Sequence, residues 1–196
     1  DRTHADRSTN VDANTWRDGT LASDNTSSQQ ELSNRTNLTY NAFFTRKLKK
    51  EGRSIALTFA GSNAERNNEL QLMSELNNRI TSRRDTVDQF KDGNSKTDNL
   101  NASIVYSEPL SKRWRSSIGY NYSQSKAHSV LSSFNKNAAG EYKVFDREFS
   151  NDFNFDTRTS AANLTFGYKS DKIDFNVTNV LRHDDMNMFN NLDNID

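Results

Sequence analysis

The chain has 196 residues, of which only 32% are hydrophobic, and its formal net charge is +0. Soluble domains usually contain about 45–50% apolar residues, so this chain is too polar for an ordinary hydrophobic core. Its mean hydropathy is −0.97, and no stretch approaches the roughly 18 apolar residues of a spanning helix. The neutral charge gives no reason to expect nucleic-acid binding. The absence of Cys excludes a disulfide framework and a thiol nucleophile.

The first half of the chain is predicted to contain two strands between polar loops. Residues 1–35 are rich in Asp, Asn, Ser and Thr without periodicity, and we expect an extracellular loop or a disordered segment there. Strands are expected at about 36–48 and 54–63, joined by a tight turn in which Gly52 can adopt positive φ. Alternation persists weakly as far as Leu72, and residues 64–96 are expected to form a second long loop.

The second half is predicted to contain four more strands. Two of them, at about 98–107 and 114–126, flank a turn that contains the only proline, Pro109. A third long loop is expected over 127–153. Strands at about 156–168 and 173–182 then flank a basic turn, and residues 183–196 are expected to be a loop. We interpret the chain as an internal piece of a longer polypeptide, because it starts at Asp1 without Met or a signal peptide.

Each of these six strands alternates apolar residues with small polar ones, so that it has one apolar and one polar face. This pattern suits a wall between lipid and a water-filled lumen. The residues expected to face lipid are Leu38, Tyr40, Leu57, Phe59, Ile104, Ile118, Leu164, Phe166 and Phe175. The residues expected to face the lumen are Asn41, Thr58, Asn101, Ser103, Asn121, Asn163, Thr165 and Asn176.

The connections alternate between short and long, as in outer-membrane barrels with short periplasmic turns and long extracellular loops. The predicted fold class is therefore all-β, an antiparallel up-and-down transmembrane β-barrel segment of about six strands over residues 36–182. Aromatic residues expected at the membrane interfaces are Trp114, Tyr120, Tyr122 and Tyr168. Six strands cannot close a barrel, because the smallest single-chain forms use about 8. The remaining strands must come from the rest of the polypeptide or from other chains.

Three stretches, residues 44–54, 106–112 and 119–123, carry a resemblance that extends over about 36–182. They resemble the barrel region of Bacteroidetes-type TonB-dependent receptors, in the outer membrane β-barrel family branch. The resemblance implies a large barrel that encloses a plug domain of the same polypeptide. Its further partner would be a TonB-type energy-coupling protein or a surface lipoprotein.

No motif for enzymatic chemistry is present, and we expect neither an enzyme nor a cofactor. His183, Asp184 and Asp185 could in principle ligate a metal, but no second ligand cluster accompanies them, and a solvated segment is the better interpretation. Five Asn-x-Ser/Thr triplets coincide with strands, where both polar residues face the predicted lumen. This strand pattern explains them better than glycosylation does. The basic turns could contact lipid phosphates or a periplasmic partner, although ordinary solvation is the simpler explanation.

The leading functional hypothesis is part of the wall of a bacterial outer-membrane receptor that takes up a solute, surrounded by outer-membrane lipid. One alternative is a structural or secretion-associated barrel without active transport. Another is a soluble β-rich binding or adhesin module, which would need more apolar residues to fill two inner faces.

Overall fold

The computed structural model describes residues 1–192 and contains seven long strands. Their bounds are β1 Arg2–Arg17, β2 Thr20–Lys47, β3 Ser54–Asn78, β4 Arg83–Pro109, β5 Trp114–Lys136, β6 Tyr142–Lys169 and β7 Asp174–Asn190. Every strand pairs antiparallel with its neighbour in the sequence, in the order β1-β2-β3-β4-β5-β6-β7. The chain is thus an all-β up-and-down sheet, as predicted, with one strand more than expected.

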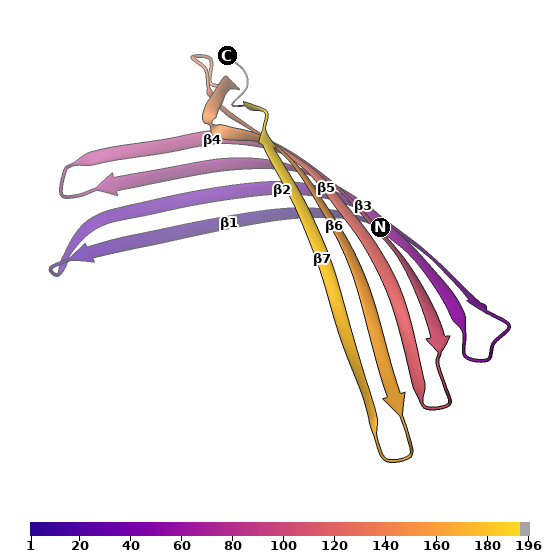
Figure 1. Ribbon diagram of the computed structural model, residues 1–196. Helices are drawn as coiled ribbons and strands as arrows, with labels where there is room; N and C mark the ends of the chain where they lie inside the picture. The colour runs from indigo at the N-terminus through magenta and orange to yellow at the C-terminus, as the bar shows by residue number, and fades with distance from the viewer. Residues whose placement is uncertain (193–196) are drawn as a thin grey trace.

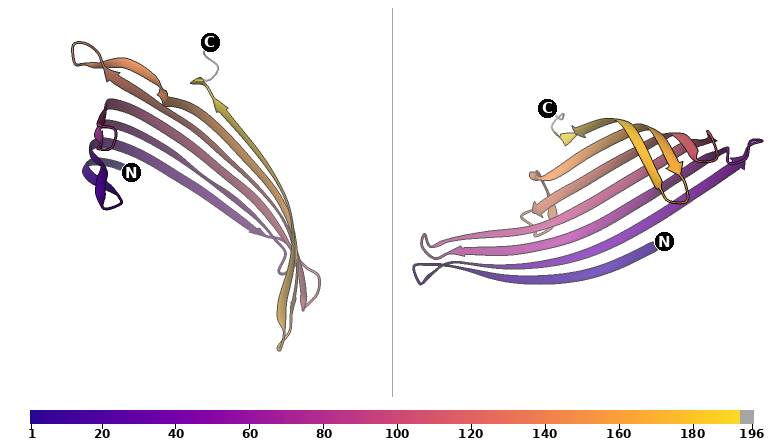
Figure 2. Two further views of the ribbon diagram at one scale, coloured as in Figure 1. Left: turned by 90° about the vertical axis from the view of Figure 1, so that its left-hand side faces the viewer. Right: turned by 60° about the horizontal axis from the view of Figure 1, so that its bottom comes forward.

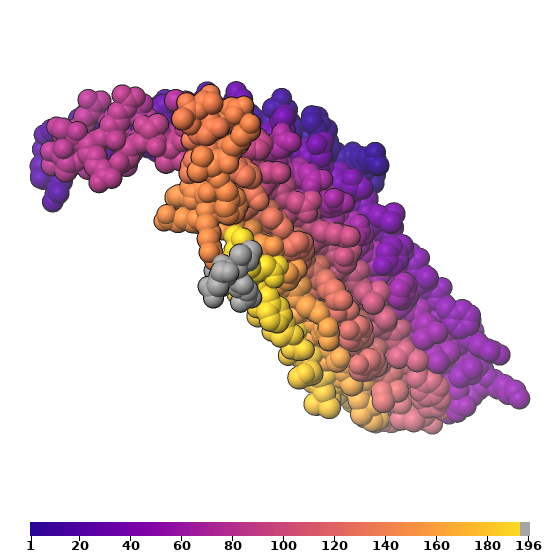
Figure 3. All heavy atoms as spheres, turned by 90° about the horizontal axis from the view of Figure 1, so that it is seen from above, coloured from indigo at the N-terminus to yellow at the C-terminus, as the bar shows by residue number. Residues whose placement is uncertain are grey.

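The sheet is strongly curved and open, with β1 and β7 at its opposite edges (Figures 1 and 2). The turns β2–β3, β4–β5 and β6–β7 lie together at one end, the lower right of Figure 1. The other ends of the strands extend far from these turns. The ribbons form a single sheet (Figures 1 and 2), and the space-filling view from above shows the bend of this sheet (Figure 3).

The described residues contain no buried hydrophobic side chain. Large apolar residues such as Phe43, Ile118 and Leu164 are exposed on the sheet instead. A soluble sandwich would bury one face of each sheet against the other, and no such layer is present in residues 1–192. None of the described residues forms a helix long and apolar enough to cross a membrane.

The structure differs from the sequence expectation in the segments expected to be loops. Residues 1–35 form β1 and the first part of β2, and residues 64–96 belong almost entirely to β3 and β4, which are joined by a turn at 79–82. Their sequences lack alternation because both faces of these extensions are polar. The backbone ladder and cross-strand polar contacts suffice there: the Arg66 guanidinium lies 2.8 Å from Glu31, and Asn77 donates to Asp24 at 2.9 Å.

The same holds for the expected loops at 127–153 and 183–196. β5 continues to Lys136 and β6 begins at Tyr142, so the connection is a turn over 137–141 with Gly140 at φ 82°. β7 continues to Asn190, and residues 193–196 lie outside the described residues. The asymmetry between the two ends therefore comes from the length of the strand extensions rather than from irregular loops.

A large irregularity bends the β5–β6 hairpin near its tip. Leu131 pairs with Asn151, but Ser133 pairs with Asp146, so residues 147–150 leave the ladder. The fully buried Ser133 fastens this excursion: its backbone N–H donates to Ser150 Oγ at 2.9 Å and its hydroxyl donates to the Phe149 carbonyl at 2.5 Å. Bulges of this kind redirect a strand and increase its local twist.

The tip of this hairpin is tied to β4 by a cluster around Asp88. Lys136 Nζ lies 2.6 Å from one oxygen of Asp88, and the Tyr142 hydroxyl donates to the other at 2.5 Å. Gln71 donates to the same hydroxyl at 2.9 Å. The hydrogen bonds from Lys136 and Tyr142 lower the pKa of the Asp88 carboxyl below its ordinary value of 3.8.

We predict that hydrogen-exchange protection at this tip falls in acid. A carboxyl whose folded-state pKa is lowered stabilises the fold above its ordinary value, 3.8 for Asp88, and this contribution is lost as the pH falls through the lowered value. Protection factors of the amides around Lys136 and Tyr142 should therefore decrease below about pH 4. The Asp88→Asn variant should lose this pH dependence. Asp92→Asn, an exposed change on the same strand, should keep it, and an unchanged profile in Asp88→Asn would contradict the assignment.

Candidate membrane-spanning surface

Strand register divides the side chains into two faces, because residues directly opposite in an antiparallel ladder point the same way. Leu57 lies opposite Phe44 and Ile104, which in turn lies opposite Tyr120. Following this register across β2–β7 brings together all nine residues expected to face lipid. We call this side the apolar face. Its members expected from the sequence are Leu38, Tyr40, Leu57, Phe59, Ile104, Ile118, Leu164, Phe166 and Phe175.

The same register brings together the eight residues expected to face the lumen. We call this side the polar face. It contains Asn41, Thr58, Asn101, Ser103, Asn121, Asn163, Thr165 and Asn176. Which face meets lipid and which meets water stays a prediction. The separation of the two sets onto opposite sides is a property of the fold.

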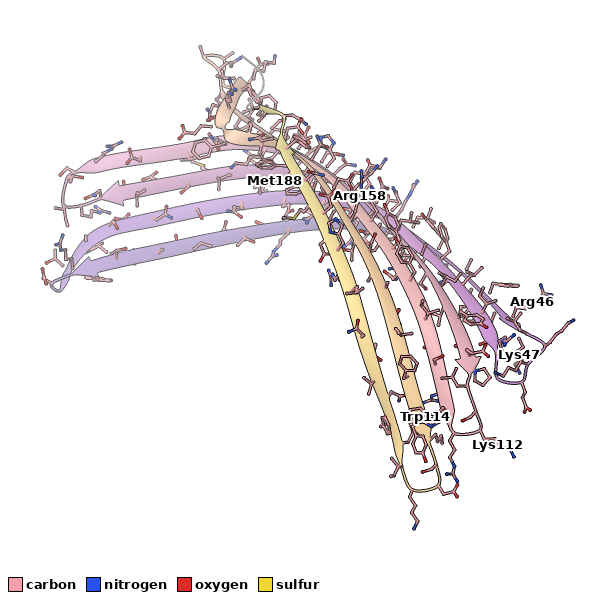
Figure 4. All side chains as sticks on the ribbon, viewed as in Figure 1. Arg46, Lys47, Lys112, Trp114, Arg158 and Met188 are labelled. Carbon is pink, nitrogen blue, oxygen red and sulfur yellow. The ribbon has the colours of Figure 1, made fainter. Side chains whose placement is uncertain are left out.

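Three aromatic rings form a cluster on the apolar face, next to the turns at the end of the sheet. The ring of Trp114 lies 4.9 Å from that of Tyr168 and 6.1 Å from that of Phe175, and the last two rings are 5.7 Å apart. Trp114 is seen near the lower end of the sheet in Figure 4. Amphipathic rings in this position are typical of the aromatic girdles of outer-membrane barrels.

The other two expected girdle residues, Tyr120 and Tyr122, lie on the same face of β5, further from the turn. Tyr120 donates its hydroxyl to Ser160 at 3.2 Å. Beyond Tyr122, the residues of β5 on the apolar face are Gln124 and Lys126, so the apolar run of this strand ends at Tyr122. The run from Trp114 to Tyr122 spans about 26 Å along the strand at about 3.3 Å per residue.

The apolar run shifts steadily along the strands from β2 to β7. In β2 it extends from Leu38 to Phe44, which are in register with Asn187 and Leu181 of β7. In β7 the run of apolar residues on the apolar face extends from Leu181 to Phe175 and is interrupted only by Asn179. Expressed in the numbering of β7, the two ends of the band lie at 187 and 181 in β2 and at 181 and 175 in β7. Each end is therefore displaced by six residues across the five strand spacings from β2 to β7.

This displacement measures the tilt of the strands relative to the apolar band. Six residues correspond to about 20 Å along a strand, and five spacings of about 4.8 Å correspond to about 24 Å across the sheet. The band therefore crosses the sheet obliquely, at about 40° to the direction perpendicular to the strands. Strands of outer-membrane barrels tilt by about 35–45°, so a band with this slope would lie level in a membrane.

Small uncharged side chains dominate the polar face at the level of this band. Asn121 donates to Asn101 at 3.3 Å, and the hydroxyls of Thr165 and Thr178 are 2.9 Å apart. Gly119 is buried beneath the amide of Asn163, which occupies the space that a Cβ would need. A hollow of about 530 Å³ crosses this region, lined by residues of β2 to β6 such as Asn41, Asn101 and Ser123.

The pair Phe43–Phe44 belongs to the site but was not assigned from the sequence, because two adjacent aromatic residues interrupt the alternation. Register places Phe44 on the apolar face opposite Leu57 and Phe43 on the polar face opposite Thr58. In β7, Val177 and Leu181 also join the apolar face. Their alternation with Thr178 and Arg182 was a signal that the sequence already contained.

The candidate metal ligands do not gather. His183, Asp184 and Asp185 lie on β7, so consecutive side chains point to opposite sides. Asp184 accepts hydrogen bonds from Thr159 at 2.5 Å and from Arg182 at 2.7 Å. Within residues 1–192, no group of three His, Asp or Glu side chains could hold a metal ion.

Comparison with solved structures finds weak similarity to outer-membrane receptors. Two are structures from Pseudomonas aeruginosa: the ferripyoverdine receptor of the outer membrane bound to ferripyoverdine, and FpvA bound to a heterologous pyoverdine–iron complex. Their sequence identities are 10% and 8%, and the TM-scores are 0.35 and 0.36. The matches cover 93% and 97% of this chain but only 35% and 37% of those chains. This chain therefore spans about a third of their length.

A third solved structure, described as a pore forming protein, matches 92% of this chain and 96% of its own at 11% identity and a TM-score of 0.15. Among curated protein sequences, none matches this chain.

The sequence itself gives the assignment. Residues 46–177, two thirds of the chain, match the sequence model of the outer membrane protein beta-barrel family. The matched region extends from the end of β2 into β7 and includes the aromatic cluster and most of both faces. Together with the open antiparallel sheet, this match places the chain in the bacterial outer membrane. The chain belongs to the outer membrane protein beta-barrel family.

Proposed function

We propose that these strands form part of the wall of an outer-membrane receptor that takes up a solute by TonB-dependent transport. The remaining strands and a plug domain would belong to the same polypeptide. The observation that carries this proposal is the oblique apolar band on one face of the sheet, opposite a face of small uncharged residues. Such a sheet separates lipid from water, and a large barrel of this kind encloses space for a plug and a solute.

The polar face supports a role in passage of a hydrophilic solute. Its Asn, Ser and Thr side chains provide both donors and acceptors without fixed charge. Asn41, Asn101 and Asn121 could therefore contact water, plug or solute without selecting the sign of its charge. Selectivity would then depend on the extensions beyond the band and on the plug.

The first test labels single cysteines in a chain that has none of its own. Ser103→Cys on the polar face should react with a membrane-impermeant thiol reagent when the lumen is open. The adjacent Ile104→Cys on the apolar face should be protected by lipid. Alternation should recur at Asn163→Cys and Leu164→Cys. Labelling of the apolar set and protection of the polar set would refute the assignment of the two faces.

The second test measures the cost of a charge at two adjacent positions. Leu164 lies opposite Ile118, near the middle of the apolar band. Leu164→Arg should destabilise the protein folded in bilayers by about 2–4 kcal/mol, as for a lipid-facing arginine near the bilayer midplane. Asn163→Arg should cost much less, because its surroundings are aqueous. Trp114→Arg provides the depth control, since the penalty falls to about 0–1 kcal/mol near an interface.

Comparable penalties at Leu164 and Trp114 would count against a membrane band, because a soluble sheet has no dependence on depth. Near-neutral results at all three positions would indicate that this surface is solvated.

Transport itself requires a cellular measurement with the full polypeptide. Uptake of the cognate solute should stop when the TonB-type energy-coupling protein is deleted, while surface binding of the solute is retained. A barrel that serves only as a scaffold or in secretion would show no energy-dependent uptake. A screen of candidate solutes in cells with and without the coupling protein separates these outcomes.

A further inference from the structure

The three turns at the end of the sheet nearest the aromatic cluster carry a concentrated positive charge. Their residues 46–54, 108–115 and 169–174 contain ten Lys and Arg but only four Asp and Glu. The excess of six positive charges is balanced by an equal negative excess in the rest of this neutral chain. We call the ten cations the basic rim: Arg46, Lys47, Lys49, Lys50, Arg53, Lys112, Arg113, Arg115, Lys169 and Lys172.

Four of these cations are already paired within the protein. Lys50 and Arg53 each lie 2.7 Å from Glu108, and Arg115 and Lys169 lie 3.9 and 3.7 Å from Asp174. None of the other six forms an ion pair with the described residues. They are exposed, and Figure 4 shows Arg46 and Lys47 at the turn end of β2 and Lys112 in the β4–β5 turn. These six are Arg46, Lys47, Lys49, Lys112, Arg113 and Lys172.

The cations follow the oblique edge of the apolar band rather than a row of the sheet. In β2, Arg46 comes two positions after Phe44. In β5, Arg113 immediately precedes Trp114, and in β6 Lys169 immediately follows Tyr168. A row of residues perpendicular to the strands would not follow the edge of the band, because the band is oblique. The cations instead shift along the strands together with the band. When the band is level in a membrane, the same positions share one depth, just outside the aromatic cluster.

We propose that the basic rim binds the phosphate groups of anionic phospholipids, at the surface of the outer membrane that lies level with these three turns. Each Lys or Arg close to an anionic membrane surface contributes about 1 kcal/mol of attraction, or about fivefold in local lipid concentration. The aromatic cluster fixes the depth of the sheet in the membrane, and the exposed cations lie at the level of the lipid phosphates. The proposal rests on the barrel-wall assignment and is independent of solute uptake.

The test uses Trp114 as a local reporter. The chain has two Trp residues, so Trp16→Phe, with any Trp of the remaining strands and plug also replaced by Phe, leaves Trp114 as the single tryptophan. The purified full polypeptide is reconstituted in mixtures of phosphatidylethanolamine and phosphatidylglycerol, in which one or the other lipid is brominated in its acyl chains. Brominated phosphatidylglycerol should quench Trp114 about two- to fivefold more strongly than its mole fraction predicts.

The preference should disappear in Lys112→Gln/Arg113→Gln, which removes the two unpaired cations that directly precede Trp114 in the sequence. The matched control is Arg83→Gln/Arg84→Gln at the β3–β4 turn, far from this end, and it should keep the wild-type preference. Added salt should weaken the preference in the unmodified rim, because exposed charges are screened. This salt titration tests the proposal without any substitution in the rim.

The outcomes are distinguishable. Equal quenching by both brominated lipids would overturn lipid binding at the rim while leaving the membrane band intact, and would point to a protein partner instead. An absence of quenching by either lipid would overturn the membrane placement of Trp114 and with it the proposed barrel wall. A preference that survives Lys112→Gln/Arg113→Gln would show that the rim does not produce it.

Discussion

Backbone hydrogen bonding is the constraint on which this structure depends. No hydrophobic core holds the described residues together, so the sheet is maintained by its six antiparallel ladders. In hydrocarbon, each unpaired N–H or C=O group costs several kcal/mol, which forbids an exposed sheet edge. Two such edges remain, along β7 and along residues 38–47 of β2, beyond the end of its pairing with β1. Closure by further strands is therefore a condition for this sheet to exist in a membrane.

The same ladder continues from the apolar band into the polar extensions of the strands. Within the apolar band, side chains such as Phe59 and Leu164 are exposed without a protein layer over them. If the apolar face meets lipid, as we propose, lipid takes the role that a second layer has in a soluble domain. Above the band, both faces are polar, and side chains pair with each other across the strands. The contact between Arg79 and Asp24 at 2.5 Å is of this kind, and it lowers the pKa of that carboxyl. Surface ion pairs of this type contribute little energy individually, so the ladder remains the main support.

The sequence predicted the band well and the extensions poorly, for a physical reason. Alternation of apolar and polar residues leaves a signal with a period of two, and this signal located the band parts of β2–β7 and both faces. Register confirmed that residues as distant as Leu38 and Phe175 share one side. Both faces of the extensions are polar, so nothing in their sequences distinguishes a strand from a loop. β1 was missed entirely for this reason. The Ser133 bulge depends on contacts with Phe149 and Ser150, 16 and 17 residues further along the chain, that no local pattern reveals.

The charge distribution distinguishes the two ends of this otherwise repetitive sheet. The end with the basic rim is compact: its turns begin within a few residues of the apolar band, and the cations track its slope. The opposite end consists of extensions that continue far beyond the band, as β4 does between Leu100 and Arg83. An end fixed to one surface by turns and charges can tolerate wide variation at the other end. Differences in what such a barrel recognises would therefore arise in the extensions, where side chains rather than lipid set the local structure.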